Sequence, residues 1–112
     1  MPQSALTNLD GVRIDLPMDA IADFCRRNQV IEFALFGSVL RDDFRPDSDV
    51  DVMVVFDPEA HPTLYTFSRM NDELEQLFAR PVDLVTRRAV VQMANPFRTP
   101  QILRSARVVY AR

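Results

Sequence analysis

The chain has 112 residues and a formal net charge of -3 at pH 7, with 13 basic side chains, all of them arginine, against 16 acidic ones. This length suits one domain, and a single cysteine excludes a disulfide framework and a cysteine-based metal site. Two glycines are too few for a P-loop or a dinucleotide-binding loop. We expect a single domain over residues 1–112 with a loose lead over residues 1–13, no membrane-spanning segment and a cytoplasmic location.

Charge is distributed unevenly along the chain. Residues 42–57 contain six aspartates and one arginine, for a net charge of -5, whereas residues 80–112 contain seven arginines and one aspartate, for a net charge of +6. A run of charges usually indicates a solvated surface. Because some of these aspartates are embedded in an apolar stretch, the acidic segment indicates a site. The basic end is compatible with an exposed surface, a partner protein, a triphosphate or RNA.

Hydrophobic periodicity predicts alternating helices and strands. In chain order we expect a helix over 17–28, a strand over 31–36, a short helix over 38–43, a loop over 45–48, a strand over 50–56, a helix over 63–79, a strand over 82–86, a partly helical stretch over 89–106 broken around Pro96 and Pro100, and a final strand, or else a helix end, over 108–110. This alternation predicts an α/β fold, with a small mixed β-sheet of three to four strands flanked by helices.

Three aspartates lie near the starts of two predicted strands. Side chains two residues apart share one face of a strand, so Asp49 and Asp51 are expected side by side. Their repulsion and lost hydration would be relieved by a divalent cation, and hard oxygen ligands favour Mg²⁺, with Mn²⁺ as the alternative. If the strand over 82–86 lies beside the strand over 50–56, Asp83 joins them. Three carboxylates can then hold two metal ions for in-line displacement at phosphorus.

A turn that suits a phosphate group follows the first predicted strand. Gly37 lets the backbone approach a ligand, and the Ser38 hydroxyl can donate to a phosphate oxygen. Arg41, one turn further along, can add a charge-assisted contact. A phosphate turn and an acidic metal site in one domain point to a nucleoside triphosphate bound with Mg²⁺. A nuclease built on the same carboxylates would not need this turn.

The spacing of these motifs resembles that of the minimal nucleotidyltransferase (MNT) family, a branch of the DNA polymerase β-like nucleotidyltransferase superfamily. Gly37-Ser38 is followed after ten residues by Asp49-Val50-Asp51, and the stretches 81–85 and 102–110 are also similar to family segments. The resemblance spans about residues 18–110. It implies a nucleotidyltransferase fold like the palm of polymerase β.

The resemblance also implies roles for the site residues. Gly37 and Ser38 would hold the triphosphate, Asp49 and Asp51 would bind both metal ions, and Asp83 would complete the site and act as base toward the acceptor hydroxyl. One position departs from the pattern, because many members carry glycine where this chain has Asp42. A further acid beside the phosphate turn is expected to weaken nucleotide binding.

The acceptor is expected on another chain, because 112 residues leave no room for a domain that would hold it. The resemblance implies a partner: many MNT proteins are antitoxins of HEPN-domain ribonuclease toxins, and some transfer AMP from ATP to a tyrosine of the toxin. We therefore expect a protein adenylyltransferase in a toxin-antitoxin system. Two alternatives remain: a non-catalytic antitoxin that acts by occlusion, and a nucleotidyltransferase that works through a homo-oligomer on a small molecule or RNA. Nucleic acid is otherwise not an expected partner.

Overall fold

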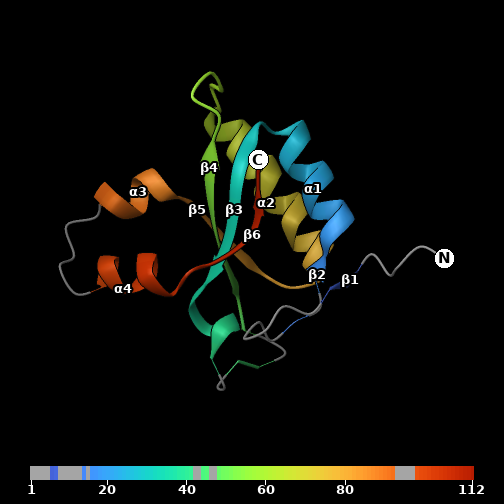
Figure 1. Ribbon diagram of the computed structural model, residues 1–112. Helices are drawn as coiled ribbons and strands as arrows, with labels where there is room; N and C mark the ends of the chain where they lie inside the picture. The colour runs from blue at the N-terminus through green and yellow to red at the C-terminus, as the bar shows by residue number, and fades with distance from the viewer. Residues whose placement is uncertain (1–5, 8–13, 15, 42–43, 46–47, 93–97) are drawn as a thin grey trace.

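The computed structural model describes residues 6–7, 14, 16–41, 44–45, 48–92 and 98–112 (Figure 1). Its elements in chain order are β1 (Leu6–Thr7), β2 (Leu16–Pro17), α1 (Met18–Arg27), β3 (Val30–Phe36), the 3₁₀ turn η1 (Gly37–Leu40), β4 (Val50–Phe56), α2 (Leu64–Phe78), β5 (Val82–Thr86), α3 (Arg87–Gln92), α4 (Arg98–Ser105) and β6 (Arg107–Ala111). Among the described residues, no helix combines the length and the apolar character needed to cross a membrane.

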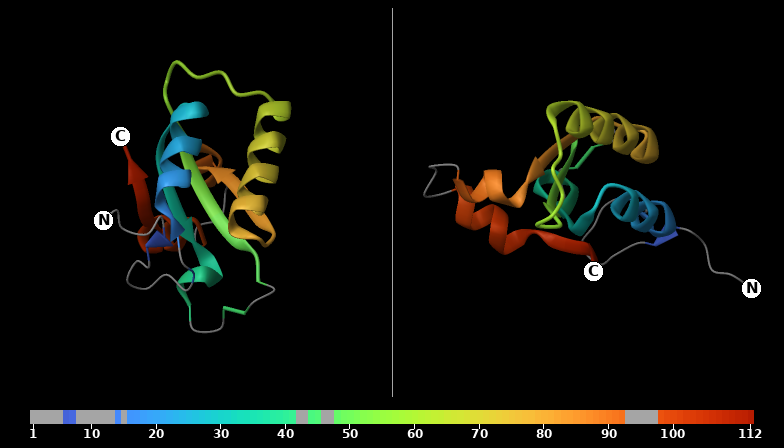
Figure 2. Two further views of the ribbon diagram at one scale, coloured as in Figure 1. Left: turned by 90° about the vertical axis from the view of Figure 1, so that its right-hand side faces the viewer. Right: turned by 90° about the horizontal axis from the view of Figure 1, so that it is seen from above.

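The main sheet has four strands in the order β5-β4-β3-β6. Strand β3 pairs antiparallel with β4 and β6, and β4 pairs parallel with β5, with α2 as the crossover between them. Helices α1 and α2 cover one face of the sheet, and α3 and α4 lie on the other side (Figure 2). The predicted mixed sheet flanked by helices is therefore confirmed, and the last predicted element is a strand.

Alternation along β4 divides its side chains between two apolar clusters. Val50, Val52 and Val54 are fully buried in the larger cluster, against α1 and α2. Met53 lies on the opposite face, where a smaller cluster combines it with residues of β3, α3 and α4, namely Ala34, Phe36, Val90 and Ile102. Burial of each large apolar side chain contributes about 1.5–3 kcal/mol to folding. The smaller cluster fixes α3 and α4 against the face that carries Asp51.

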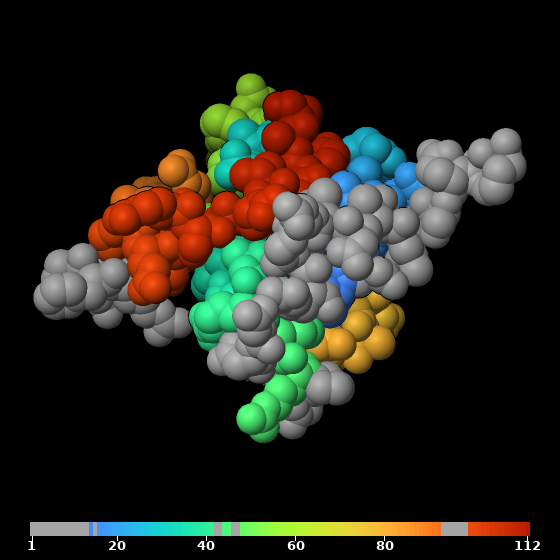
Figure 3. Space-filling view, turned by 60° about the horizontal axis from the view of Figure 1, so that its bottom comes forward, coloured from blue at the N-terminus to red at the C-terminus, as the bar shows by residue number. Residues whose placement is uncertain are grey.

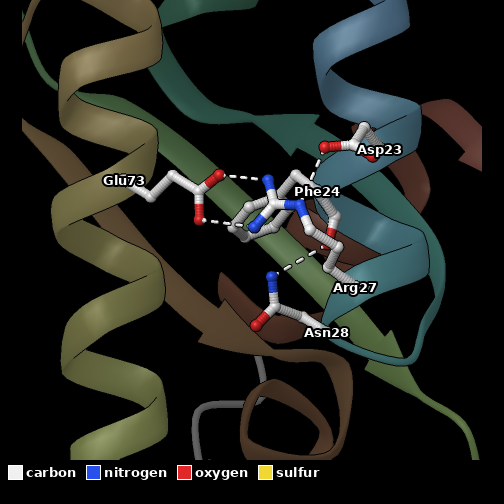
Figure 4. A network of polar contacts seen from close by, with 5 residues as sticks. All are labelled: Asp23, Phe24, Arg27, Asn28 and Glu73. Carbon is white, nitrogen blue, oxygen red and sulfur yellow. Dashed lines mark hydrogen bonds and ion pairs between the residues drawn. The ribbon is translucent and has the colours of Figure 1, made fainter.

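Helices α1 and α2 are joined by a polar network at their solvent-exposed edge (Figure 4). The Arg27 guanidinium donates to both carboxylate oxygens of Glu73 and, at 2.7 Å, to Asp23 one turn earlier on α1. These hydrogen bonds, that to Glu73 above all, raise the pKa of Arg27. Nearby, the Asn28 amide donates to the Phe24 carbonyl at 2.9 Å and ends the helix. Because Arg27 is about half exposed, its ion pair with Glu73 aligns the two helices but adds little to the free energy of unfolding.

Two local predictions need correction. The helix predicted over 38–43 is instead the single 3₁₀ turn η1, and positions 42 and 43 lie outside the described residues. Pro100 does not break the last helix. It lies in the first turn of α4, where a backbone N–H would have no intrahelical acceptor, so its absence costs no helical hydrogen bond. Pro96 lies outside the described residues. In the predicted loose lead, Leu6–Thr7 pairs as β1 with β2, and the rest of that lead lies outside the description.

Candidate active site

Asp51 and Asp83 are direct neighbours across the parallel pair β4 and β5. Residues in register on adjacent strands share one face of the sheet, so both carboxylates belong to the side of α3 and α4. Asp51 is half-buried and Asp83 is exposed. The condition that the strand over 82–86 lies beside the strand over 50–56 is thereby met, and it brings these two aspartates together.

Asp49 immediately precedes β4 and is exposed. Within the described residues, no three His, Cys, Asp or Glu side chains gather closely enough to hold a metal ion as they stand. The hard carboxylate oxygens of Asp51 and Asp83 nevertheless suit a divalent cation. The complete cluster of Asp49, Asp51 and Asp83 stays a prediction.

The Gly37 turn lies in direct contact with Asp51. Gly37 has a φ of +78°, which other residues rarely adopt, and a β-carbon built there would lie 2.1 Å from Oδ2 of Asp51. Only glycine allows the carboxylate to reach this position. Because Phe36 pairs with Asp51 across β3 and β4, the turn and the carboxylate are held by the same strand pairing.

The Ser38 hydroxyl faces the segment that carries Asp49. Its Oγ lies 3.4 Å from the Asp49 carbonyl oxygen, which is long for a hydroxyl hydrogen bond. This weak contact leaves the hydroxyl easily turned toward a ligand. The predicted phosphate turn and the predicted first metal ligand are therefore adjacent in space.

Arg80 holds the segment that leads to Asp49. Its guanidinium lies over the Phe44 ring, 4.7 Å from the centroid, and Nη1 donates to the Arg45 carbonyl at 3.3 Å. The Val50 N–H donates to the Pro81 carbonyl at 2.9 Å, next to Arg80 in the chain. Sequence reasoning missed this role, although Arg80 directly precedes the Pro81 that opens β5.

A pocket of about 470 Å³ opens beside Asp51, between η1 and α4. Figure 3 shows α4 (orange-red) and the start of β6 beside the green-teal residues of η1 on one face of the molecule. Small-molecule sites commonly measure about 300–1,000 Å³. The lining residues are Phe36, Gly37, Leu40, Arg41, Asp51, Gln101, Ile102, Ser105 and Arg107.

The pocket contains three of the six predicted site residues: Gly37, Arg41 and Asp51. Ser38, Asp49 and Asp83 are not part of its lining. Two guanidinium groups, from Arg41 and Arg107, line the same pocket as the Asp51 carboxylate, which gives it the mixed charge that a metal-bound phosphate chain needs.

Sequence reasoning missed the wall that α4 and β6 contribute. Gln101 and Ser105 are four residues apart and so share one side of α4, and the Ser105 hydroxyl donates to the Gln101 carbonyl at 2.7 Å. Arg107 follows at the start of β6. The net positive charge of residues 80–112 was the one signal for this wall, but it did not indicate which arginine reaches the site.

The family model described as "Nucleotidyltransferase domain" matches residues 18–109. Two curated relatives are similar over part of the chain. A candidate protein adenylyltransferase, MJ1379 of Methanocaldococcus jannaschii, is 34% identical over 69 residues, which are 62% of this chain and 66% of that protein. Protein adenylyltransferase MntA of Thermococcus cleftensis is 43% identical over 56 residues, or 50% of this chain and 54% of that protein. The chain thus matches less than two thirds of each relative's length.

Three solved structures share the fold. A candidate minimal nucleotidyltransferase is 33% identical, with a TM-score of 0.61, over 80% of this chain and 86% of that one. A toxin-antitoxin with AMP-PNP is 20% identical, with a TM-score of 0.65, over 87% of this chain and 75% of that one. The toxin-antitoxin MntA-HepT is 18% identical, with a TM-score of 0.57, over 85% of this chain and 70% of that one. The predicted fold is confirmed by these likenesses.

Proposed function

Because this chain belongs to the nucleotidyltransferase domain family, in its minimal nucleotidyltransferase branch, we propose that it transfers AMP from ATP to a hydroxyl of a partner protein. The observation that carries the proposal is the contact between Asp51 and the Gly37 turn at a pocket of about 470 Å³. The names of the two curated relatives support a protein as the acceptor.

The proposed reaction is a displacement at the α-phosphorus of ATP. The acceptor oxygen forms a bond to that phosphorus, the bond to the bridging oxygen breaks, and pyrophosphate leaves with the electron pair. Asp83 accepts the proton of the acceptor hydroxyl, which its exposed position at the start of β5 permits. Gly37, Ser38 and Arg41 bind the phosphates.

Asp49, Asp51 and Asp83 are the proposed ligands of two Mg²⁺ ions. Asp51 and Asp83 fit this role because they are in register on neighbouring strands, and Asp49 lies two residues before Asp51. When bound, the ions would neutralise charge on the attacking and leaving oxygens. The chain's own part would be to hold the carboxylates close to the phosphate turn, and the contact between Gly37 and Asp51 supports this for one of them.

The proposed partner is a HEPN-domain toxin, for which this chain would act as the antitoxin. Two of the structures that share the fold are toxin-antitoxin proteins, one described as MntA-HepT and one with AMP-PNP. Residues 18–109, which match the domain, contain the proposed phosphate and metal residues, and we propose that the acceptor hydroxyl belongs to the toxin.

The test is transfer of label from α-phosphate-labelled ATP, with Mg²⁺, to the protein encoded by the neighbouring gene, which the proposal expects to be a HEPN-domain toxin. We expect labelled toxin with the native chain and at least a thousandfold slower labelling with Asp51→Asn. Asp72→Asn is the matched control, because Asp72 is an exposed carboxylate on α2, away from the pocket. Absence of label on the toxin contradicts the proposal. Full neutralisation of the toxin by the Asp51→Asn variant would instead support the non-catalytic antitoxin that acts by occlusion. Label on RNA or a small molecule would support the nucleotidyltransferase with a non-protein acceptor.

A further inference from the structure

The chain carries no acidic residue after Asp83, although residues 84–112 contain six arginines. This segment forms α3, α4 and β6. On the two helices, Arg87, Arg88 and Arg104 are exposed, and none of them forms an ion pair within the described part of the chain. Neither helix has an acid in its first turn, where acids are usually favourable. We call Arg87, Arg88, Val91 and Arg104 the basic flank.

Two arginines outside the basic flank, Arg27 and Arg112, are paired with acids. Arg27 pairs with Asp23 and Glu73 (Figure 4), and Arg112 pairs with Asp57. Helix α2 contains one arginine and three acids. Since α1 and α2 cover the opposite face of the sheet (Figure 2), positive charge is concentrated on the side of α3 and α4. Such separation of charge is typical of a surface that attracts a partner of opposite sign.

The basic flank is next to the mouth of the pocket. Helix α4, which carries Arg104, also supplies Gln101, Ile102 and Ser105 to the pocket wall. Figure 1 shows α3 and α4 together beside the sheet, so a partner seated on them lies close to the pocket. A macromolecule bound there can therefore present a group to the pocket without covering α1 or α2.

We propose that the basic flank docks an acidic face of the protein that carries the acceptor hydroxyl. The inference rests on the proposed function for the identity of that protein, whereas the acidity expected of its docking face follows from the positive charge of the flank alone. Val91 is 55% exposed on α3, the helix that also carries Arg87 and Arg88, and offers an apolar contact beside their charges. Helices α3 and α4 contain no aromatic ring on which a base could stack, which favours a protein over single-stranded RNA.

The test measures docking separately from catalysis. The probe is a fluorescein-labelled peptide of ten glutamates, whose anisotropy is followed at 50 mM salt with the full chain. Arg87→Glu/Arg104→Glu is compared with Arg26→Glu/Arg69→Glu, two exposed arginines of α1 and α2, so that both variants change the net charge equally. We expect at least a tenfold loss of peptide affinity in the first variant and less than a twofold loss in the second. Circular dichroism checks that both fold.

Catalysis gives a second measurement on the same variants. With the labelled acceptor protein, the flank variant should raise the KM for the acceptor at least tenfold and leave the KM for ATP unchanged. Equal loss of peptide affinity in both variants overturns the proposal, because the effect would then reflect net charge alone. Tighter binding of a ten-nucleotide RNA than of the peptide, lost in the flank variant, also overturns it. Peptide binding at the flank with no transfer to any protein would instead contradict the proposed function and still support the flank as a docking surface.

Discussion

Oδ2 of Asp51 occupies the space in which a side chain on Gly37 would begin, since a β-carbon at that position would lie 2.1 Å from it. The two residues are 14 positions apart in the chain, and the pairing of Phe36 with Asp51 brings them together. The phosphate turn and the carboxylate therefore form one structural unit. A change at either residue is expected to disturb both nucleotide and metal binding.

The substitution Gly37→Ala tests this unit. Alanine would meet the Asp51 carboxylate and would have to adopt a φ of +78°, so we expect the free energy of unfolding to fall by about 1–3 kcal/mol. ATP affinity should fall at least tenfold, because the carboxylate must move. Urea unfolding and calorimetric titration with MgATP measure the two effects.

The control for that variant is the reverse exchange at the end of α2. Ala79 has a φ of +58° as the left-handed cap residue, so Ala79→Gly should raise stability by about 0.5–1 kcal/mol and leave ATP binding unchanged. Unchanged ATP affinity in Gly37→Ala would show that the turn does not hold the nucleotide.

Arg107 is the pocket residue that sequence reasoning did not identify, and it gives the second prediction. Its guanidinium lines the same pocket as Arg41 and Asp51. Removal of a charge-assisted contact to a phosphate costs about 1.5–3 kcal/mol, so Arg107→Ala should raise the KM for ATP about 10- to 100-fold. Steady-state kinetics at saturating acceptor measure this change, with Arg26→Ala as the exposed control on α1. An unchanged KM would place the triphosphate elsewhere.

Sequence reasoning succeeded where local pattern and fold agree. The strands over 50–56 and 82–86 were predicted with their observed bounds, because both are rich in valine and a proline marks one end of each: Asp57-Pro58 follows the first, and Pro81 precedes the second. It also placed Asp83 beside Asp51 on the condition that the two strands are neighbours, which the parallel register satisfies. The other site residues were also predicted from residue type and spacing, and the family resemblance supplied the roles expected of Gly37, Ser38 and the three aspartates.

The missed features depend on tertiary placement. Gln101 and Arg107 reach the pocket because Val90 and Ile102 pack on Ala34, Phe36 and Met53, and no local pattern reports such contacts across the chain. The length of η1 was also not predictable, since a stretch of four to six residues can form either one 3₁₀ turn or a short α-helix.

Arg80 provides the third prediction, which concerns positioning. Its guanidinium covers Phe44 and donates to the Arg45 carbonyl, so it holds the segment before Asp49. Arg80→Met keeps much of the apolar stem but removes both contacts. We expect kcat to fall about tenfold and the free energy of unfolding to fall by about 1 kcal/mol. Because the effect acts through Asp49, the Mg²⁺ concentration for half-maximal activity should rise. Arg80→Lys should restore part of the charge contact, whereas an unaltered Mg²⁺ dependence would leave Arg80 a purely structural role.

The ion pair between Asp57 and Arg112 gives the fourth prediction, on pH. The Arg112 guanidinium donates to Oδ2 of Asp57, and the Glu59 N–H donates to Oδ1 at 2.8 Å; together they hold the pKa of the Asp57 carboxyl below its usual value of 3.8. A carboxyl whose pKa is lower in the folded state stabilises the fold above the unfolded pKa, and this contribution is lost as pH falls through the folded pKa. The contact ties the end of β6 to the end of β4.

Asp57→Asn should therefore lower the Tm at pH 6, and this difference from the native protein should shrink as the pH falls below 3.8 and the native carboxyl becomes protonated. Thermal unfolding followed by circular dichroism from pH 6 to pH 2.5 measures the difference between the two proteins. Added salt should reduce that difference at pH 6, because the pair is partly exposed and is screened. Asp72→Asn, on the exposed side of α2, should show no such convergence. If the native and Asp57→Asn proteins differed in Tm by the same amount at pH 6 and pH 2.5, the difference would come from packing of the amide and not from the ion pair.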